Sequence, residues 1–252
     1  MNWNDAGLIL TAAKHGETSM IIHALTREKG RFAGLVRGGA GRRMRGVLQP
    51  GNEVDLSWRG RLSEQLGTFT VEARKAHTSN LFDAPVALAA SSAALALLDI
   101  ALPEREPHPA LYDASLLLLT SMEKNADIWP TLFVKWELGL LAEIGYGLDL
   151  SSCAATGNVE NLVYVSPKTG KAVSKSAGEP YHDRLLPLPV FLQPGPTDLL
   201  PSDAAIKSDI LNGLALTGYF IEKAILEHRP NIHLAARERF LITLEKSFFR
   251  AA

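Results

Sequence analysis

The stretches Thr18-Ser-Met-Ile-Ile-His-Ala-Leu-Thr26 and Phe32-Ala-Gly-Leu-Val36 decide the fold of the first part of this chain. Apolar, β-branched and aromatic residues recur in them with a period near two, and Glu28-Lys29-Gly30 between them is a turn signal. This combination predicts two paired strands. Three further runs have the same character, namely Gly7–Ala12, Asn52–Trp58 and Gly67–Ala73. Five short strands in residues 1–79 predict a small closed barrel.

The type of barrel follows less directly from the pattern. Among small barrels, the five-stranded OB-fold is the common host of a basic surface that binds nucleic acid, so we expect an OB-fold over residues 1–79. An SH3-like barrel has a similar strand pattern and is an alternative that the pattern does not exclude. Analogy between folds gives only a prior expectation of the barrel type.

The spacing of apolar residues becomes helical from Asn80 onward. Asp83 is placed to cap the first helix, and Pro85 is tolerated in its first turn. Helices are predicted over 85–100, 109–124, 127–144, 202–228 and 232–249. Residues 149–200 lose helical spacing and gather Gly, Pro, Ser and Thr, which indicates a long ordered loop or a small β insert. The predicted fold class is therefore α+β, with a barrel over 1–79 and an α-helical domain over 80–252.

Charge is divided unevenly between these two parts, although the formal net charge is only −1. Residues 1–79 contain 12 Lys or Arg against 7 Asp or Glu, whereas residues 80–252 contain 14 against 20. A basic barrel and an acidic remainder indicate that a polyanion binds chiefly at the N-terminal part.

The densest basic segment runs from Arg27 to Gly46 and contains one acid, Glu28. Its cations are Arg27, Lys29, Arg31, Arg37, Arg42, Arg43 and Arg45. Four glycines predict that residues 37–46 form a flexible loop, whose arginines could reach phosphates of varied geometry. We therefore predict that these seven residues bind a nucleic-acid backbone, and six such contacts would give a salt slope of roughly −4 on single strands. A merely solvated charged hairpin is the alternative.

Aromatic side chains that stack on bases would strengthen this hypothesis, but the candidates are few. Phe32, Trp58 and Phe69 lie at alternating apolar positions of predicted strands, where an aromatic residue more often belongs to the core. Trp3 precedes the first strand. The sequence allows two alternatives for its side chain, namely exposure to solvent or a position that covers the end of the barrel.

The spacings that enzyme chemistry requires are missing from the sequence. Gly39-Ala-Gly41 lacks the last glycine of a dinucleotide loop, and Gly170-Lys171-Ala172 lacks the Ser or Thr of a P-loop. His182-Asp183 has no matching nucleophile motif, so a hydrolase is a distant third hypothesis. His228 and His233 lack the i, i+4 spacing of a paired metal site. We predict a protein that is not an enzyme and that needs no cofactor.

Cellular location and redox chemistry are also constrained. The N-terminus does not have the pattern of a secretory signal peptide, which is a charged start followed by an apolar run and a cleavage site. Ser91, Ser92 and Asp99 interrupt the most apolar stretch, 84–100, so a bilayer span is not expected. Cys153 is the only cysteine and permits no intrachain disulfide. We expect a soluble cytoplasmic protein that associates with the nucleoid.

Motifs along the whole chain resemble the RecO family. The motifs are Gly7-Leu-Ile-Leu, Gly16-Glu-Thr-Ser-Met, Lys29-Gly-Arg31 with the Gly/Arg segment after it, Leu48-Gln-Pro-Gly51, Leu66-Gly-Thr-Phe-Thr-Val-Glu-Ala73, Phe133 to Gly147, Tyr164-Val-Ser-Pro-Lys-Thr-Gly170, and Leu185-Leu-Pro-Leu-Pro189. Each motif alone is weak, but their order and coverage are specific. The resemblance implies an OB-fold followed by a helical domain with a small insert like a zinc finger.

The resemblance also implies a DNA-repair function. Members bind single- and double-stranded DNA, anneal complementary strands, contact the single-strand-binding protein SSB, and act with RecR to load RecA. An acidic, hydrophobic SSB tail could bind the helical domain, where Arg237 and Arg239 could receive its carboxylate, although their interpretation as plain surface charges is favoured. An RNA-binding OB protein or an adaptor that does not anneal would share the basic barrel and is the alternative.

Some members of the family ligate zinc with four cysteines in the insert, and this chain departs from that pattern. Cys153 stands at the first ligand position and Thr156 at the second, and Ser174 and Ala177 are placed at the other two. One thiolate beside neutral hydroxyls is not a tetrahedral zinc site. We therefore predict an insert, about residues 149–200, that holds no metal.

Overall fold

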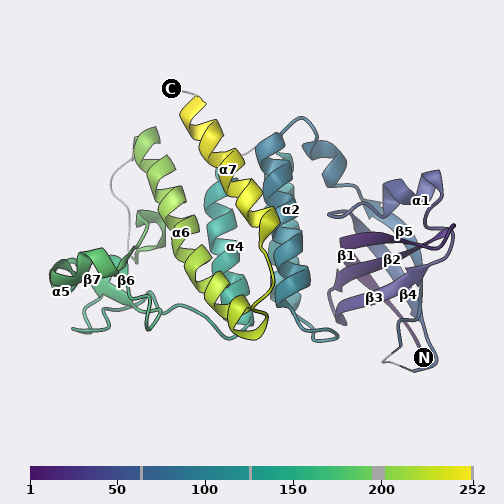
Figure 1. Ribbon diagram of the computed structural model, residues 1–252, viewed down its shortest axis with the longest axis horizontal. Helices are drawn as coiled ribbons and strands as arrows, with labels where there is room; N and C mark the ends of the chain where they lie inside the picture. The colour runs from purple at the N-terminus through teal and green to yellow at the C-terminus, as the bar shows by residue number, and fades with distance from the viewer. Residues whose placement is uncertain (63–64, 125–126, 195–201, 251–252) are drawn as a thin grey trace. The chain divides into compact units, whose positions relative to one another are not determined.

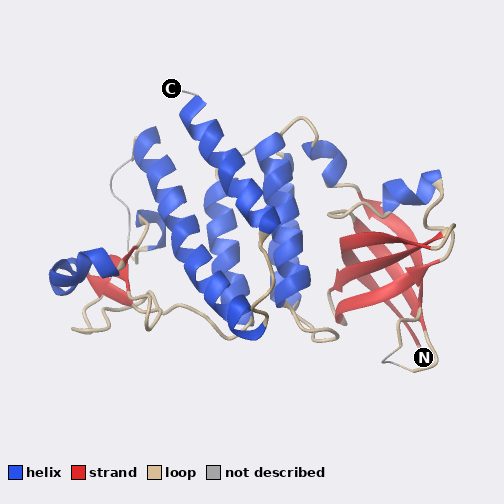
Figure 2. Cartoon of the chain, viewed as in Figure 1, coloured by secondary structure: helices blue, strands red, loops and turns tan. Residues whose placement is uncertain are grey.

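The computed structural model describes residues 1–62, 65–124, 127–194 and 202–250, without the side chain of Arg250. Strands gather into one barrel and one small sheet, and helices make up most of the rest (Figure 2). The predicted α+β fold class is confirmed.

The first strands close into a barrel in the order β1-β2-β3-β5-β4 (Figure 1). The strands are β1 (Asn2–His15), β2 (Ser19–Thr26), β3 (Gly30–Val36), β4 (Glu53–Arg59) and β5 (Thr68–Lys75), and the short helix α1 (Arg42–Val47) lies between β3 and β4. The long β1 pairs with β4 through residues 2–8 and with β2 through residues 7–15. Closure is completed by parallel pairing of Leu35 with Thr68. This arrangement is the predicted OB-fold.

Alternate residues of each strand point into the barrel, as a period of two requires. The aromatic residues Phe32, Trp58 and Phe69 are all buried there, so their prediction as core residues is confirmed. Trp3 packs on this cluster, with its ring stacked at 5.9 Å from Trp58, and so covers the core. Each fully buried large apolar side chain contributes about 1.5–3 kcal/mol to folding.

The predicted flexible loop over 37–46 is wrong in its second half, which is the helix α1. Gly41 is the N-cap in an extended conformation, and its carbonyl accepts a hydrogen bond from the Arg45 amide at 3.0 Å. Just after the helix, Leu48 is buried in the barrel core. The burial of Leu48 and the backbone bond outweigh the roughly 1 kcal/mol by which a glycine such as Gly46 disfavours a helix.

Helices and the barrel together form the first of two compact units, Met1–Ala126 with His233–Ala252. Besides α1, its helical elements are η1 (Thr78–Leu81), α2 (Pro85–Ala101), α3 (Pro109–Glu123) and α7 (Ala235–Arg250). The prediction that Asp83 caps the first helix is wrong, because Ala84 is the N-cap and no side chain caps the helix. Pro85 opens α2 and has no backbone N–H to satisfy.

The second compact unit is Asp127–Ile232. It contains α4 (Trp129–Glu143), α5 (Lys175–Gly178), η2 (Glu179–Arg184), η3 (Val190–Leu192) and α6 (Asp203–His228), and a sheet of order β7-β6-β8 made of β6 (Leu162–Val165), β7 (Ala172–Ser174) and β8 (Leu186–Pro187). Of the two alternatives predicted for residues 149–200, a long loop or a small β insert, the sheet favours the β insert. Residues 195–200 of this predicted range lie outside the described part. Ser202 caps α6, since its hydroxyl accepts from the Ala205 amide at 3.3 Å.

The predicted boundary at 79/80 marks the change from strands to helices, but it does not separate the compact units. Helices α2, α3 and α7 belong with the barrel, and α4 and α6 belong with the insert. Among the described residues, no helix has the length and hydropathy that a membrane span needs.

Candidate nucleic-acid interface

Four of the seven predicted cations lie together around α1. Arg37 follows β3, and Arg42, Arg43 and Arg45 belong to α1, and all four side chains are exposed. None of the four forms an ion pair with another described residue, whereas several arginines elsewhere do. Four exposed guanidinium groups within nine residues can donate hydrogen bonds to several phosphates at once. We call these four residues the α1 arginines.

The backbone around the α1 arginines is held in place by the rest of the barrel. Gly38 has φ +69°, a left-handed conformation that suits glycine, and it turns the chain after β3. The Ala40 amide then donates to the Thr18 carbonyl at 3.0 Å, which ties the segment to the β1–β2 loop. The α1 arginines therefore extend from a fixed backbone at the β1–β2 end of the barrel.

Arg27 and Lys29 lie elsewhere, at the turn between β2 and β3. Since β3 separates Lys29 from Arg37, the two are about 26 Å apart at roughly 3.3 Å per residue. Arg27 forms a bidentate salt bridge with Asp113 of α3, with Nε 3.1 Å from Oδ1 and Nη2 2.8 Å from Oδ2. The hydrogen bond from Arg27 lowers the pKa of Asp113. Arg27 therefore joins the barrel to α3, and Lys29 is exposed on the same turn.

Arg31 is buried, which corrects its predicted place on an exposed basic surface. Its Nε donates to the Leu102 carbonyl at 2.9 Å, and its Nη1 lies 3.3 Å from Asp99 Oδ1 on α2. The same carboxylate oxygen lies 2.7 Å from His23 Nδ1 of β2. The charge of Arg31 is thus used to attach α2 to the barrel, and a phosphate could not replace Asp99 without opening this contact.

Part of the outer face of β2 and β3 is therefore covered. OB-folds commonly bind nucleic acids on the face of strands 2 and 3 and on the neighbouring loops. In this chain the Arg105 amide, in the segment 102–106, donates to the Arg31 carbonyl at 2.9 Å. A side chain at Gly30 would meet the Glu106 carbonyl at 2.0 Å, so only glycine permits this approach. Beyond His23 and Ala33, toward the α1 arginines, the outward residues Ile21 and Leu35 of this face are half-buried.

Sequence reasoning missed two further arginines of the barrel, Arg59 and Arg61, as candidates for phosphate contacts. Both are exposed, at the end of β4 and in the loop that leads to β5. The ammonium of Met1 donates to the Gly60 carbonyl at 2.8 Å, so the start of the chain steadies this turn. The available signal was the pair of arginines around Gly60, in a loop position that OB-folds often use for ligands.

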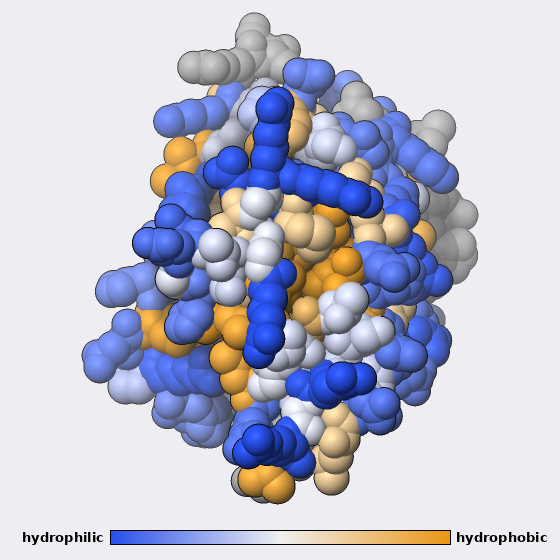
Figure 3. Space-filling view, turned by 90° about the vertical axis from the view of Figure 1, so that its right-hand side faces the viewer, coloured by the Kyte–Doolittle hydropathy of each residue, from blue (hydrophilic) through white to orange (hydrophobic). Residues whose placement is uncertain are grey.

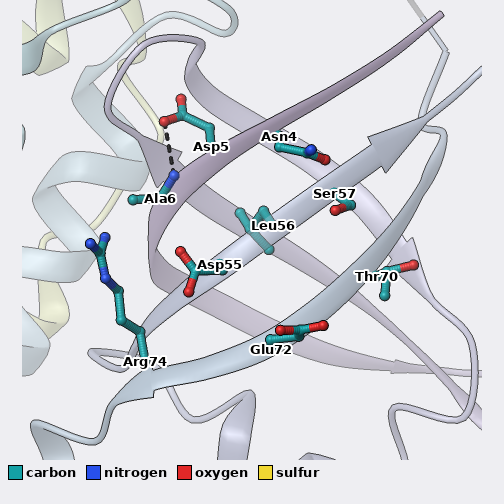
Figure 4. Close-up of a pocket in the computed structure, with 9 residues that line it drawn as sticks. All are labelled: Asn4, Asp5, Ala6, Asp55, Leu56, Ser57, Thr70, Glu72 and Arg74. Atoms are coloured by element: carbon teal, nitrogen blue, oxygen red, sulfur yellow. Dashed lines mark hydrogen bonds between the residues drawn. The ribbon is translucent and has the colours of Figure 1, made fainter.

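A hollow on the barrel is an unsuitable site for a polyanion. It has a volume of about 480 Å³ and lies on the outer face of β1, β4 and β5 (Figure 4). Asp55 and Glu72 stand directly opposite each other on neighbouring strands there. Their like charges repel phosphate, and the nearby Arg74 is already paired with Glu53 at 3.1 Å. On the side of the molecule formed by the barrel, long hydrophilic side chains project beside apolar ones (Figure 3).

The insert brings together three of the four positions predicted from the zinc-binding pattern. Cys153 is buried, and its sulfur lies 3.3 Å from the Ser174 amide and 3.4 Å from the Ser174 hydroxyl. Burial raises the pKa of Cys153, but hydrogen bonds from Ser174 and Thr156 outweigh it and lower the pKa to about 6. Ala177 lies in α5 and offers no ligand atom. This donor set has one sulfur and two hydroxyls, which does not fit zinc.

Other predicted residues are dispersed. Arg237 is buried and Arg239 is exposed, and residues two apart on α7 do not face the same way, so the two cannot bind one carboxylate together. His182 and Asp183 form an exposed pair, with Nε2 2.9 Å from Oδ1. Among the described residues, no group of three or more His, Cys, Asp or Glu could hold a metal.

The fold and its charges define an α+β protein whose OB-fold barrel has a basic end and an acidic outer face. Comparison with protein families then narrows the class. Residues 1–76 match the model for the N-terminal part of recombination protein O, and residues 83–231 match the model for its C-terminal part. The chain therefore belongs to the recombination protein O family, whose role is DNA repair and recombination.

Individual relatives agree over nearly the whole length. The DNA repair protein RecO of Rhodospirillum centenum is 49% identical over 249 residues, which is 98% of this chain and 96% of that protein. A RecO protein of Methylorubrum extorquens is 47% identical over 245 residues, 96% of this chain and 97% of the relative. That of Beijerinckia indica is 45% identical over 252 residues, 100% of this chain and 98% of the relative.

Proposed function

We propose that this chain is a recombination mediator that binds single- and double-stranded DNA, anneals complementary strands, and works without catalysis. The observation that carries the proposal is the group of α1 arginines, which are exposed and without ion-pair partners among the described residues. Membership of a DNA-repair family supports DNA rather than RNA as the polyanion.

Annealing needs little more than such a surface. Two strands repel through their phosphates, and bound cations reduce this repulsion while contributing the entropy of released counterions. Contacts to phosphate carry no sequence information and leave base edges free to pair. A fixed basic end on the barrel could hold one strand in this way while a second strand pairs with it.

The partners follow from the family. We propose that the chain acts with RecR, contacts the tail of SSB through its helical part, and in this way helps to load RecA onto SSB-coated strands. Of the two arginines predicted to receive a tail carboxylate, only Arg239 is exposed. The association with the nucleoid would follow from DNA binding.

The test is annealing of two complementary oligonucleotides coated with SSB, measured at several salt concentrations. The parent protein should anneal in a salt-sensitive manner, and the triple variant R42A/R43A/R45A should lose most of the activity. An absence of annealing by the parent, or stronger binding to structured RNA than to DNA, would favour an RNA-binding protein or an adaptor instead.

A further inference from the structure

The helix α1 has little stability of its own. It consists of six residues, none of which is buried, and no side chain caps its N-terminus. A helix of this length does not persist by itself in water. Arg42 and Arg43 lie in its first turn, where the helix dipole disfavours positive charge, and Gly46 disfavours the helical conformation. Contacts with the barrel must therefore hold α1 in place.

The last carbonyls of α1 lack the backbone donors that a longer helix would supply. The residue four positions after Gly46 is Pro50, which has no N–H. The residue four positions after Val47 is Gly51, whose amide instead donates to the Ile9 carbonyl of β1 at 2.7 Å. Both carbonyls therefore need donors from outside the helix.

The side chain of Asn52 supplies these donors. Its Nδ2 lies 2.9 Å from the Gly46 carbonyl oxygen and 3.3 Å from that of Val47. Asn52 is buried, and its backbone is fixed, because its amide donates to the Gln49 carbonyl at 3.1 Å and its carbonyl accepts from the Ile9 amide at 3.0 Å. Its Oδ1 is also buried and has no hydrogen-bond partner among the described residues. This unpaired oxygen carries a desolvation cost, which the two donated bonds must offset.

We propose that Asn52 is a positioning residue of the DNA interface, which bonds the end of α1 and so holds Arg42, Arg43 and Arg45 in one helical arrangement. This inference rests on the proposed function. Arg42 and Arg45 are three residues apart and lie on one face of the helix, where a phosphate between them would relieve their repulsion. In an unwound segment each arginine would have to be ordered when DNA binds, which lowers affinity. Asn52 itself has no charge and is too buried to contact DNA.

The first variant is Asn52→Ala in the full chain, studied by two measurements. Trypsin cleavage after Arg42, Arg43 and Arg45, relative to cleavage after Arg61, should become about tenfold faster, because the protease needs an unwound segment. The affinity for a labelled oligonucleotide should fall several-fold, up to about tenfold. The slope of affinity against salt should stay that of the parent, because every arginine remains. A role of Asn52 in global stability alone would leave the affinity of the folded variant unchanged.

Two substitutions at Gly46 change the same helix while Asn52 stays in place. A Cβ atom at Gly46 would meet no atom within 4 Å, so a side chain has room there. Gly46→Ala favours the helix by about fivefold, and N52A/G46A should therefore recover most of the lost affinity. Gly46→Pro disrupts the helix, keeps every arginine, and should lower affinity at least as much as N52A, which tests the inference even where N52A does not fold. The control is Asn80→Ala, which removes an amide donor to Glu123 in the same compact unit and should bind DNA like the parent.

A folded N52A variant with the affinity of the parent, or a loss that Gly46→Ala does not restore, would overturn the inference. An affinity of Gly46→Pro equal to that of the parent would overturn it as well. Failure of the proposed function gives a different result: R42A/R43A/R45A would keep the salt-dependent binding of the parent, while trypsin would still cleave α1 of N52A faster.

Discussion

The salt dependence of DNA binding tests the assignment of the α1 arginines most directly. Four guanidinium groups that each displace one counterion from a single strand give a slope of about −2.8 in log Kobs against log salt. This slope predicts that affinity falls about fifty-fold between roughly 50 and 200 mM salt. In R42A/R43A/R45A only Arg37 remains of the four α1 arginines, so the slope that this group contributes should fall from about −2.8 to about −0.7, and the loss of affinity due to it should fall to about threefold.

The assay is fluorescence anisotropy with a labelled oligonucleotide at five or more salt concentrations. Alanine favours helix over arginine slightly, so the variant should keep α1. The matched control is K168A/K175A/K223A, which removes the same charge from exposed positions of the second compact unit. The control should keep the slope of the parent. Equal slopes for parent and R42A/R43A/R45A would refute the assignment, and equal shifts in both triple variants would show that net charge alone decides affinity.

Three further predictions concern the surroundings of this surface. Arg31→Ala should lower the free energy of unfolding, measured in urea, by about 3 kcal/mol, because it leaves the half-buried Asp99 beside His23 without its arginine partner. A loss of DNA affinity in the folded variant would contradict this structural role of Arg31. Burial lowers the pKa of His77, although Glu123 partly opposes it, so the unfolded chain binds the proton first as the pH falls through about 6.5. Stability should then decrease toward acid by up to about 1.4 kcal/mol per pH unit, and a His77→Gln variant that shows the same decrease would count against His77 as its cause. Protein washed with chelator should contain no stoichiometric zinc by atomic emission, and one zinc per chain would disprove the metal-free insert around Cys153.

Much of the barrel was predictable because its signal is local. A period of two with turn residues between the runs depends on neighbours in the sequence, and so does the placement of Trp58 and Phe69 in the core. The basic character of residues 27–46 is also a local property. The short helix α1 was not predictable from its glycines, because the burial of Leu48 in the distant barrel core stabilises it.

The roles of individual arginines were decided by tertiary structure. Arg31 and Arg37 have similar surroundings in the sequence, but Asp99, 68 residues away, binds Arg31 and no described residue pairs with Arg37. Asp113, 86 residues away, likewise binds Arg27. The sequence by itself determined that the barrel is basic and that the chain resembles one family from end to end. Which cations stay exposed depends on long-range packing, because only the folded chain brings a carboxylate of α2 or α3 against one arginine and leaves another to solvent.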